Sequence, residues 1–286
     1  MKSAIYKFII KSHNFFLGLG DNLNFYIDGF VNKKYFNYPY GNKPHTTKEK
    51  YLEIWDKAKS ISFPEIDRLE KQFGYAASKE WIDELALLTQ VVIKGSEINY
   101  QHGRVLYSVL SSYIKKNPNI NLNILETGTA RGFSSICMSK SISDMDSYGA
   151  IISFDIIPNN QSMFWGCISD LDGPKTRLEL LKNYKNLLTR ITYIQGDTRI
   201  QVKKHSTSRV NFAFIDGGHK YEDVLNDFNF ISGRQEKGDI VIFDDYTQSK
   251  FSGIVRAVDE ICQKYKYSSQ VVLLGTDRGY CIATKK

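Results

Sequence analysis

The chain of 286 residues is 42% apolar and 24% charged, which is typical of a folded globular protein. No apolar run approaches the roughly 20 residues that a membrane-spanning helix needs, so we expect no membrane span. The net charge of +7 is spread in short groups such as Lys33–Lys34 and Lys203–Lys204 rather than gathered in one basic block. The composition therefore does not favour a nucleic-acid partner.

The amino terminus and the cysteines bear on the cellular compartment. The first residues, MKSAIYKFIIKSHNFFLGLGDNL, are apolar and basic, but Lys7, Lys11 and His13 interrupt the apolar stretch. This segment fits an uncleaved amphipathic or interaction segment better than a signal peptide. The four cysteines are widely spaced and form no C-x-x-C pair, which argues against a zinc site or a disulfide framework. Together these features predict a reduced, cytoplasmic protein.

Residues 1–120 are predicted to form a helical N-terminal region. Asn37–Thr47 contains two prolines and a glycine and is typical of a linker. Glu80–Lys94 and Gly103–Ile114 each carry apolar residues at three-to-four-residue spacing, which predicts two amphipathic helices. We expect this region to serve as a lid, in substrate binding or in oligomerisation, and its amphipathic helices are compatible with a homo-oligomer.

Residues 121–286 alternate β-branched runs with helical stretches. Strands are predicted at Leu122–Thr127, Ala150–Asp155, Ile191–Gln195, Val210–Asp216, Asp239–Asp244, Gln270–Gly275 and Gly279–Thr284, and helices at Phe133–Ile142, Thr176–Leu188, Tyr221–Ile231 and Ile254–Tyr265. Strands separated by helices predict crossover connections and a parallel sheet covered on both faces. The three-residue turn between the last two strands predicts an antiparallel hairpin. The predicted fold class is therefore α/β, a doubly wound, mostly parallel seven-stranded sheet with an antiparallel last strand and a helical N-terminal extension.

Ligands of such sheets bind at the carboxyl ends of the strands. The polar residues predicted there are nearly all acidic, namely Glu126, Asp155, Asp197, Asp216, Asp244 and Asp245. The first strand leads into Glu126–Gly132, which reads E-x-G-x-x-x-G and lacks the first glycine of a dinucleotide-binding loop. Its leading carboxylate would repel a pyrophosphate but could accept a hydrogen bond from an ammonium group or lie near a sulfonium.

Glu126–Gly132 resembles motif I of the class I S-adenosylmethionine-dependent methyltransferases, and residues 121–286 resemble their Rossmann-like fold throughout. The resemblance implies S-adenosyl-L-methionine as the cofactor. Asp155 matches the family's acidic residue that binds the ribose hydroxyls, and Asp197 matches the position beside the adenine. The cofactor-binding residues implied are Glu126, Gly128, Thr129, Gly132, Ser134, Asp155, Asp197 and Asp216.

Asp216, Asp244 and Asp245 are predicted at the ends of adjacent strands, where three carboxylates repel one another unless they are paired or bind a metal. Oxygen ligands suit Mg²⁺, so we expect these residues to bind magnesium, which would orient an acceptor hydroxyl and lower its pKa. His219 follows Asp216 by three residues and titrates near neutrality, which makes it the candidate general base.

The stretch D-G-G-H-x-Y-E-x-V-x-x-D, together with Asp244 and Asp245, is similar to the metal-dependent sugar O-methyltransferases of the macrocin and mycinamicin type. In that family the matching carboxylates hold magnesium and the matching histidine is the proposed base. The resemblance implies a magnesium-dependent O-methyltransferase that acts on a hydroxyl of a small molecule such as a sugar or glycoside.

Two other functions are compatible with parts of the sequence. A nucleic-acid or protein methyltransferase fits the positive charge, but Asp-Gly-Gly-His stands where an amino-methylating enzyme would carry an N/D-P-P-Y-type motif. A non-catalytic S-adenosylmethionine-binding scaffold would not need clustered carboxylates, which carry an electrostatic cost. Two aromatic groups stay open between function and packing: Tyr100–His102 as a cover of the cofactor, and Met163–Trp165 as part of an acceptor pocket.

Overall fold

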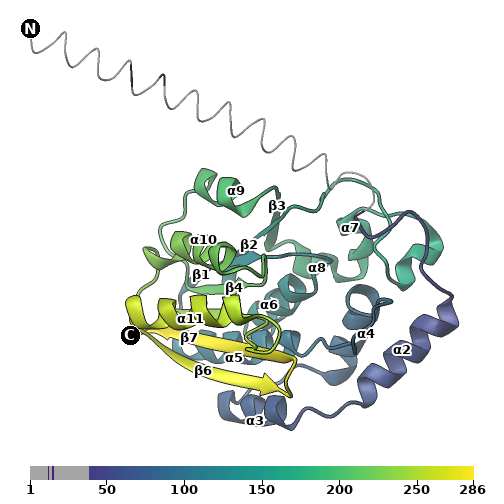
Figure 1. The fold of residues 1–286 in the computed structure, drawn as a ribbon, viewed down its shortest axis with the longest axis horizontal. Coiled ribbons are helices and arrows are strands. Elements are labelled where there is room, and N and C mark those ends of the chain that lie inside the picture. Colours follow the sequence, from purple (N-terminus) through teal and green to yellow (C-terminus); the bar gives the residue numbers. More distant parts are fainter. Residues whose placement is uncertain (1–11, 13–14, 16–38) are drawn as a thin grey trace, which may run out of the picture.

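The computed structural model describes residues 12, 15 and 39–286 (Figure 1). The predicted amphipathic N-terminal segment lies almost wholly outside the described residues, as do the first two residues of the predicted linker. Among the residues described, no helix is both long and apolar enough to cross a bilayer.

A seven-stranded sheet forms the centre of the molecule, with strand order β3-β2-β1-β4-β5-β7-β6. The strands are β1 (Asn121–Thr127), β2 (Tyr148–Asp155), β3 (Ile191–Gln195), β4 (Phe212–Ile215), β5 (Ile240–Phe243), β6 (Tyr267–Leu274) and β7 (Arg278–Lys285). The pairs among β1 to β5 are parallel, whereas β7 runs antiparallel to both β5 and β6. The predicted α/β fold class, with its antiparallel last strand, is confirmed.

Helices cover both faces of this sheet. The N-terminal helices are α2 (Lys48–Ser60), α3 (Pro64–Phe73), α4 (Lys79–Thr89) and α5 (His102–Lys116), and the later ones are α6 (Phe133–Asp144), α9 (Thr198–Lys204), α10 (Tyr221–Ser232) and α11 (Ser252–Lys264). Side chains of α3, α5 and α6 share one core with one sheet face, and those of α10 and α11 share another with the opposite face. Because strand side chains alternate between faces, Phe212 and Phe214 enter the first core and Ala213 and Ile215 the second.

One predicted helix is broken in the structure. The stretch Thr176–Leu188 forms α7 (Arg177–Leu180), the 3₁₀ turn η2 (Lys182–Tyr184) and α8 (Lys185–Leu188), after a further 3₁₀ turn, η1 (Ile168–Asp172). Thr176 and Glu179 form a capping box that starts α7. Asn183 then falls in η2, between the two short helices, as expected of a side chain that competes for backbone hydrogen bonds. The whole segment between β2 and β3 is therefore irregular and packs against α2, α4 and α6 in a third core.

Candidate active site

A cavity of about 770 Å³ opens at the carboxyl ends of β1 to β4. Four of the residues predicted to bind the cofactor line it, and the main chain of the β1–α6 and β4–α10 loops forms much of its wall. The predicted residues in its lining are Gly128, Asp155, Asp197 and Asp216, joined by Pro39, Tyr40, Ala130, Ile157, Gly196 and Arg199.

Gly128 is required by the close approach of two loops. Its φ is +91°, and a Cβ built there would lie 1.8 Å from the carbonyl oxygen of Asp216. The Asp216 N–H in turn donates to the Thr127 carbonyl at 3.0 Å. Any larger residue would push the loop after β1 away from the loop after β4, so this glycine holds the two halves of the site together.

Glu126 lies beneath the loop and does not line the cavity. Its carboxylate is fully buried and accepts hydrogen bonds from the hydroxyls of Ser134, Ser135 and Ser153. Burial raises the pKa of Glu126, and the three hydroxyls act in the opposite direction. Through these hydrogen bonds Glu126 links β1 to β2 and to the first turn of α6.

The other predicted residues of the motif also lie outside the cavity lining. The Thr129 hydroxyl is 2.5 Å from that of Ser153, so it belongs to the same buried network. Gly132 has a φ of +88° and precedes α6, where a Cβ would lie 2.8 Å from Leu181. Thr129, Gly132 and Ser134 therefore shape the loop, whereas Gly128 and Asp155 face the space a ligand could fill.

Asp155 and Asp197 end β2 and follow β3. The Asp155 carboxylate accepts from the N–H of Ala130 at 2.5 Å and of Ile157 at 2.9 Å. Asp197 caps α9 by accepting from the Arg199 N–H at 2.9 Å and also pairs with the Arg199 guanidinium. Although burial opposes it, Arg199 holds the pKa of Asp197 below its usual value. Both carboxylates are thus fixed by neighbours at the rim of the cavity.

The ends of β4 and β5 bring together what we call the acidic edge, defined as Asp216, His219, Asp244 and Asp245. One ligand atom each of Asp216, His219 and Asp245 lies within 4.8 Å of the others. His219 Nε2 is 3.3 Å from Asp245 Oδ2, and its half-exposed ring packs on Phe251 at 4.8 Å. Asp244 is buried beside this group, and its Oδ1 accepts from the Asp245 N–H at 2.7 Å.

Arg278, at the start of β7, is a residue of this edge that the sequence analysis missed. Its guanidinium pairs with the Asp245 carboxylate and lies 4.0 Å from Asp244 Oδ2. Burial raises the pKa of Asp244 to about 6, with Arg278 acting in the opposite direction. Burial, Asp244 and Asp245 raise the pKa of Asp216. The available signal was topological: Phe243, the last residue of β5, pairs with Cys281 in the antiparallel strand β7, so the start of β7 extends past the end of β5 to where Asp244 and Asp245 lie.

The two aromatic groups that the sequence left open are both packed in the interior. The His102 ring is buried between Phe133 at 4.8 Å and Phe214 at 6.1 Å, and burial lowers its pKa to about 3. Trp165 is also fully buried, and its indole N–H donates to the Lys175 carbonyl at 2.8 Å. Packing is therefore the interpretation that the contacts of His102 and Trp165 favour.

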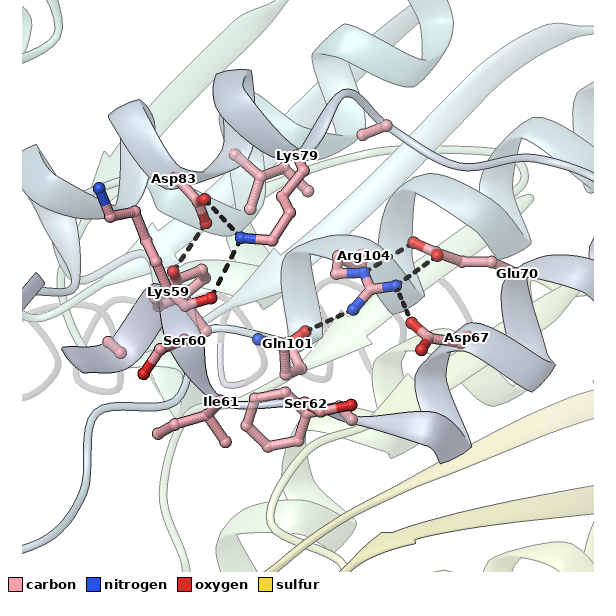
Figure 2. A pocket seen from close by; sticks show the side chains of 15 residues that line it. Lys59, Ser60, Ile61, Ser62, Asp67, Glu70, Lys79, Asp83, Gln101 and Arg104 are labelled. Atoms are coloured by element: carbon pink, nitrogen blue, oxygen red, sulfur yellow. Dashed lines mark hydrogen bonds and ion pairs between the residues drawn. The ribbon is translucent and has the colours of Figure 1, made fainter. Parts of the chain in front are cut away.

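A second cavity, of about 420 Å³, lies among the N-terminal helices (Figure 2). On one wall Lys79 pairs with Asp83 at 2.9 Å, and Asp83 also accepts from the Tyr100 hydroxyl at 2.7 Å. On the other wall Arg104 donates to Glu70 at 2.8 Å (Figure 2). These acids and bases pair with one another, and the network fixes the segment that enters α5.

Comparisons with known proteins agree with this geometry. Residues 125–246 match a family model described as a methyltransferase domain. The uncharacterized protein R132 of Acanthamoeba polyphaga mimivirus is 40% identical over 63 residues, a match that spans 21% of this chain and 28% of that protein.

Solved structures with a similar fold include two O-methyltransferases. The O-methyltransferase NovP has a TM-score of 0.50 at 18% identity, covering 68% of this chain and 83% of NovP. The O-methyltransferase TomG from Streptomyces achromogenes, solved in complex with S-adenosylmethionine, has a TM-score of 0.50 at 14% identity, covering 74% of this chain and 92% of TomG. At these identities the likeness establishes the Rossmann-like fold.

Proposed function

Because residues 125–246 match a family model described as a methyltransferase domain and form most of a Rossmann-like sheet, we propose that the chain is an S-adenosylmethionine-dependent O-methyltransferase. Its acceptor is a hydroxyl of a small molecule such as a sugar or glycoside. The observation that supports this proposal most strongly is that Asp216 belongs to two sites. It lines the cavity proposed for the cofactor, and it also lies in the group with His219 and Asp245. An acceptor oxygen held at the acidic edge therefore lies next to the cavity that would hold the methyl donor.

S-Adenosylmethionine supplies the methyl group in this proposal. Of the residues that line the cavity, Asp155 would hold the ribose hydroxyls, Asp197 would lie beside the adenine, and Gly128 would let the main chain approach the ligand. Glu126, Thr129, Gly132 and Ser134 act by holding the loop in shape, as their buried contacts suggest. The TomG complex, whose fold is similar, supports the choice of cofactor.

A divalent cation fits the acidic edge, because its carboxylates are the oxygen donors that Mg²⁺ prefers, ligand atoms of Asp216, His219 and Asp245 lie within 4.8 Å of one another, and Asp244 is buried beside them. We assign the cation to Asp216, Asp244 and Asp245. Bound there, magnesium would supply the positive charge that orients the acceptor hydroxyl and lowers its pKa.

His219 is the proposed general base. Its Nε2 takes the proton of the acceptor hydroxyl, and the Asp245 carboxylate at 3.3 Å stabilises the imidazolium that forms. With S-adenosylmethionine bound, the freed oxygen electron pair would form the bond to the methyl carbon as the carbon–sulfur bond breaks, and S-adenosylhomocysteine would be left. The half-exposed position of His219 lets the proton pass on to solvent.

We further propose that residues 1–120 cover the side of the catalytic domain, residues 121–286, at which the acceptor binds. Lys94, which follows α4, supports this role: burial and the charge of Arg278 lower its pKa, while Asp245 acts in the opposite direction. The segment after α4 therefore lies in the electrostatic field of the acidic edge. A cytoplasmic location and a homo-oligomer stay predictions.

The proposal is tested by calorimetry of S-adenosylhomocysteine binding with and without Mg²⁺, followed by a screen of glycosides and catechols for methyl transfer. We expect cofactor binding in both conditions and methylated product when Mg²⁺ is present. No binding of S-adenosylhomocysteine in either condition would refute the cofactor assignment.

A further inference from the structure

Arg278 occupies a position that bears on how the acidic edge binds a cation. It begins β7, about a quarter of its side chain is exposed, and its guanidinium contacts both Asp244 and Asp245. We infer that Arg278 is the resident counter-ion of the acidic edge, and that a divalent cation binds there by displacing its ion pair with Asp245. This inference rests on the proposed function, since it takes the cation to bind at these carboxylates.

The carboxylate oxygens of Asp244 and Asp245 are already engaged. Asp245 Oδ1 pairs with Arg278, and Asp245 Oδ2 is 3.3 Å from His219 Nε2. Asp244 Oδ1 accepts from the backbone, and Asp244 Oδ2 is 4.0 Å from Arg278 Nη1. Each oxygen of Asp245 therefore already has a cationic or ionisable partner, and a cation that binds Asp245 competes with Arg278 or His219 for it.

The charges explain why the fold needs such a partner. Asp244 and Asp245 are nearly inaccessible to solvent, and Asp216 lies within their field. Buried carboxylates without a cation destabilise a fold strongly, so Arg278 allows this edge to form before any metal binds. The same positive charge then repels an incoming divalent cation in a partly desolvated site.

The prediction is that removing the charge of Arg278 strengthens cation binding. Arg278→Met and Arg278→Gln should bind Mn²⁺ at least tenfold more tightly than the wild type, whereas Arg278→Lys should stay within threefold of it. Binding is measured by the paramagnetic resonance signal of free Mn²⁺, without cofactor or acceptor, so the readout does not depend on methyl transfer. Arg278→Gln keeps a hydrogen-bond donor for Asp245 and covers the case in which Arg278→Met does not fold.

A matched control separates this effect from a general change in charge. Lys250 is a nearby cation that pairs with the exposed Asp277 at 2.7 Å, and Lys250→Met should leave Mn²⁺ affinity within twofold of the wild type. Equal affinities in the wild type, Arg278→Met and Arg278→Gln would overturn the inference while leaving the proposed metal role intact. Failure of all the proteins to bind millimolar Mn²⁺ would overturn the metal role itself, and with it this inference.

Discussion

The carboxylates on the two sides of the site differ in the partners that stabilise them. On the side of β1 to β3, each carboxylate is satisfied by close neighbours in the sequence or in the adjacent strand: Glu126 by serines, Asp155 by backbone N–H groups, and Asp197 by Arg199. At the acidic edge, the carboxylates crowd together and depend on Arg278, which comes from a distant part of the chain. A carboxylate that is hydrogen-bonded by nearby residues shapes a binding loop. Crowded carboxylates repel one another, so the group retains affinity for a cation or a cationic part of a substrate.

The largest effect should come from His219, which belongs to the acidic edge. His219→Ala should lower turnover by about 10²- to 10⁴-fold because the acceptor hydroxyl loses its base, while S-adenosylhomocysteine affinity stays near that of the wild type. The measurement is a methyl-transfer assay beside calorimetry. Lys220→Ala, at the next exposed position, is the control with expected normal turnover. Turnover of His219→Ala within twofold of the wild type would refute the role of His219 as base.

Gly128→Ala should have the second largest effect, because the added Cβ pushes the loop after β1 away from the loop after β4. A Cβ at 1.8 Å from the Asp216 carbonyl cannot be accommodated without movement of both loops. We expect a loss of about 3 kcal/mol or more in the free energy of unfolding, measured by chemical denaturation. Gly95→Ala, where a Cβ meets nothing within 4 Å, should change stability little. Equal stability of the two variants would contradict the close contact.

Glu126→Gln tests how the buried Glu126 carboxylate affects the pH dependence of stability. Burial raises the pKa of Glu126 in the folded protein, so the unfolded chain loses its proton first as the pH rises. The wild type should therefore lose stability relative to Glu126→Gln as the pH rises above the ordinary glutamate pKa of about 4.5. The check is a series of thermal unfolding curves of both proteins from acidic to neutral pH. A stability difference that is constant across the series would show that Glu126 titrates normally.

Arg199→Met should have the smallest effect, since the Arg199 side chain is 64% exposed and such ion pairs contribute about 1 kcal/mol or less. Asp197 keeps the Arg199 backbone N–H as a partner, so α9 remains capped. We expect a change of a few-fold at most in S-adenosylhomocysteine affinity by calorimetry. A loss of a hundredfold would mean that Arg199 itself binds the cofactor.

The sequence predicted those parts of the site that follow from local pattern. All seven strands could be read from runs rich in β-branched residues, and the acidic residues at or just after the ends of β1 to β5 followed from the same pattern; the structure places these strands as expected. Helices α2, α3 and α9 were not predicted, and α9 is short, with its stability supplied by the Asp197 cap and by the buried residues Ile200 and Val202. A short helix of this kind carries too few apolar positions to show a period.

The roles of Glu126 and Arg278 could not be read from the sequence for a different reason. Glu126 opens the motif, but whether its carboxylate faces the ligand or the interior depends on Ser153 of the neighbouring strand. Arg278 lies 33 residues after Asp245, and their contact follows from the insertion of β7 between β5 and β6. Both depend on strand order, which local pattern does not determine.

The central claim, methyl transfer to a hydroxyl at the acidic edge, is tested most directly by one assay. Wild type and Asp245→Asn are incubated with S-adenosylmethionine, Mg²⁺ and a panel of glycosides, and O-methylated products are detected by mass spectrometry. The account predicts product with the wild type, its loss with Asp245→Asn or with a chelator, and unchanged S-adenosylhomocysteine binding in both proteins. Cofactor binding without methylation of any hydroxylated acceptor would contradict it and favour a non-catalytic cofactor-binding scaffold.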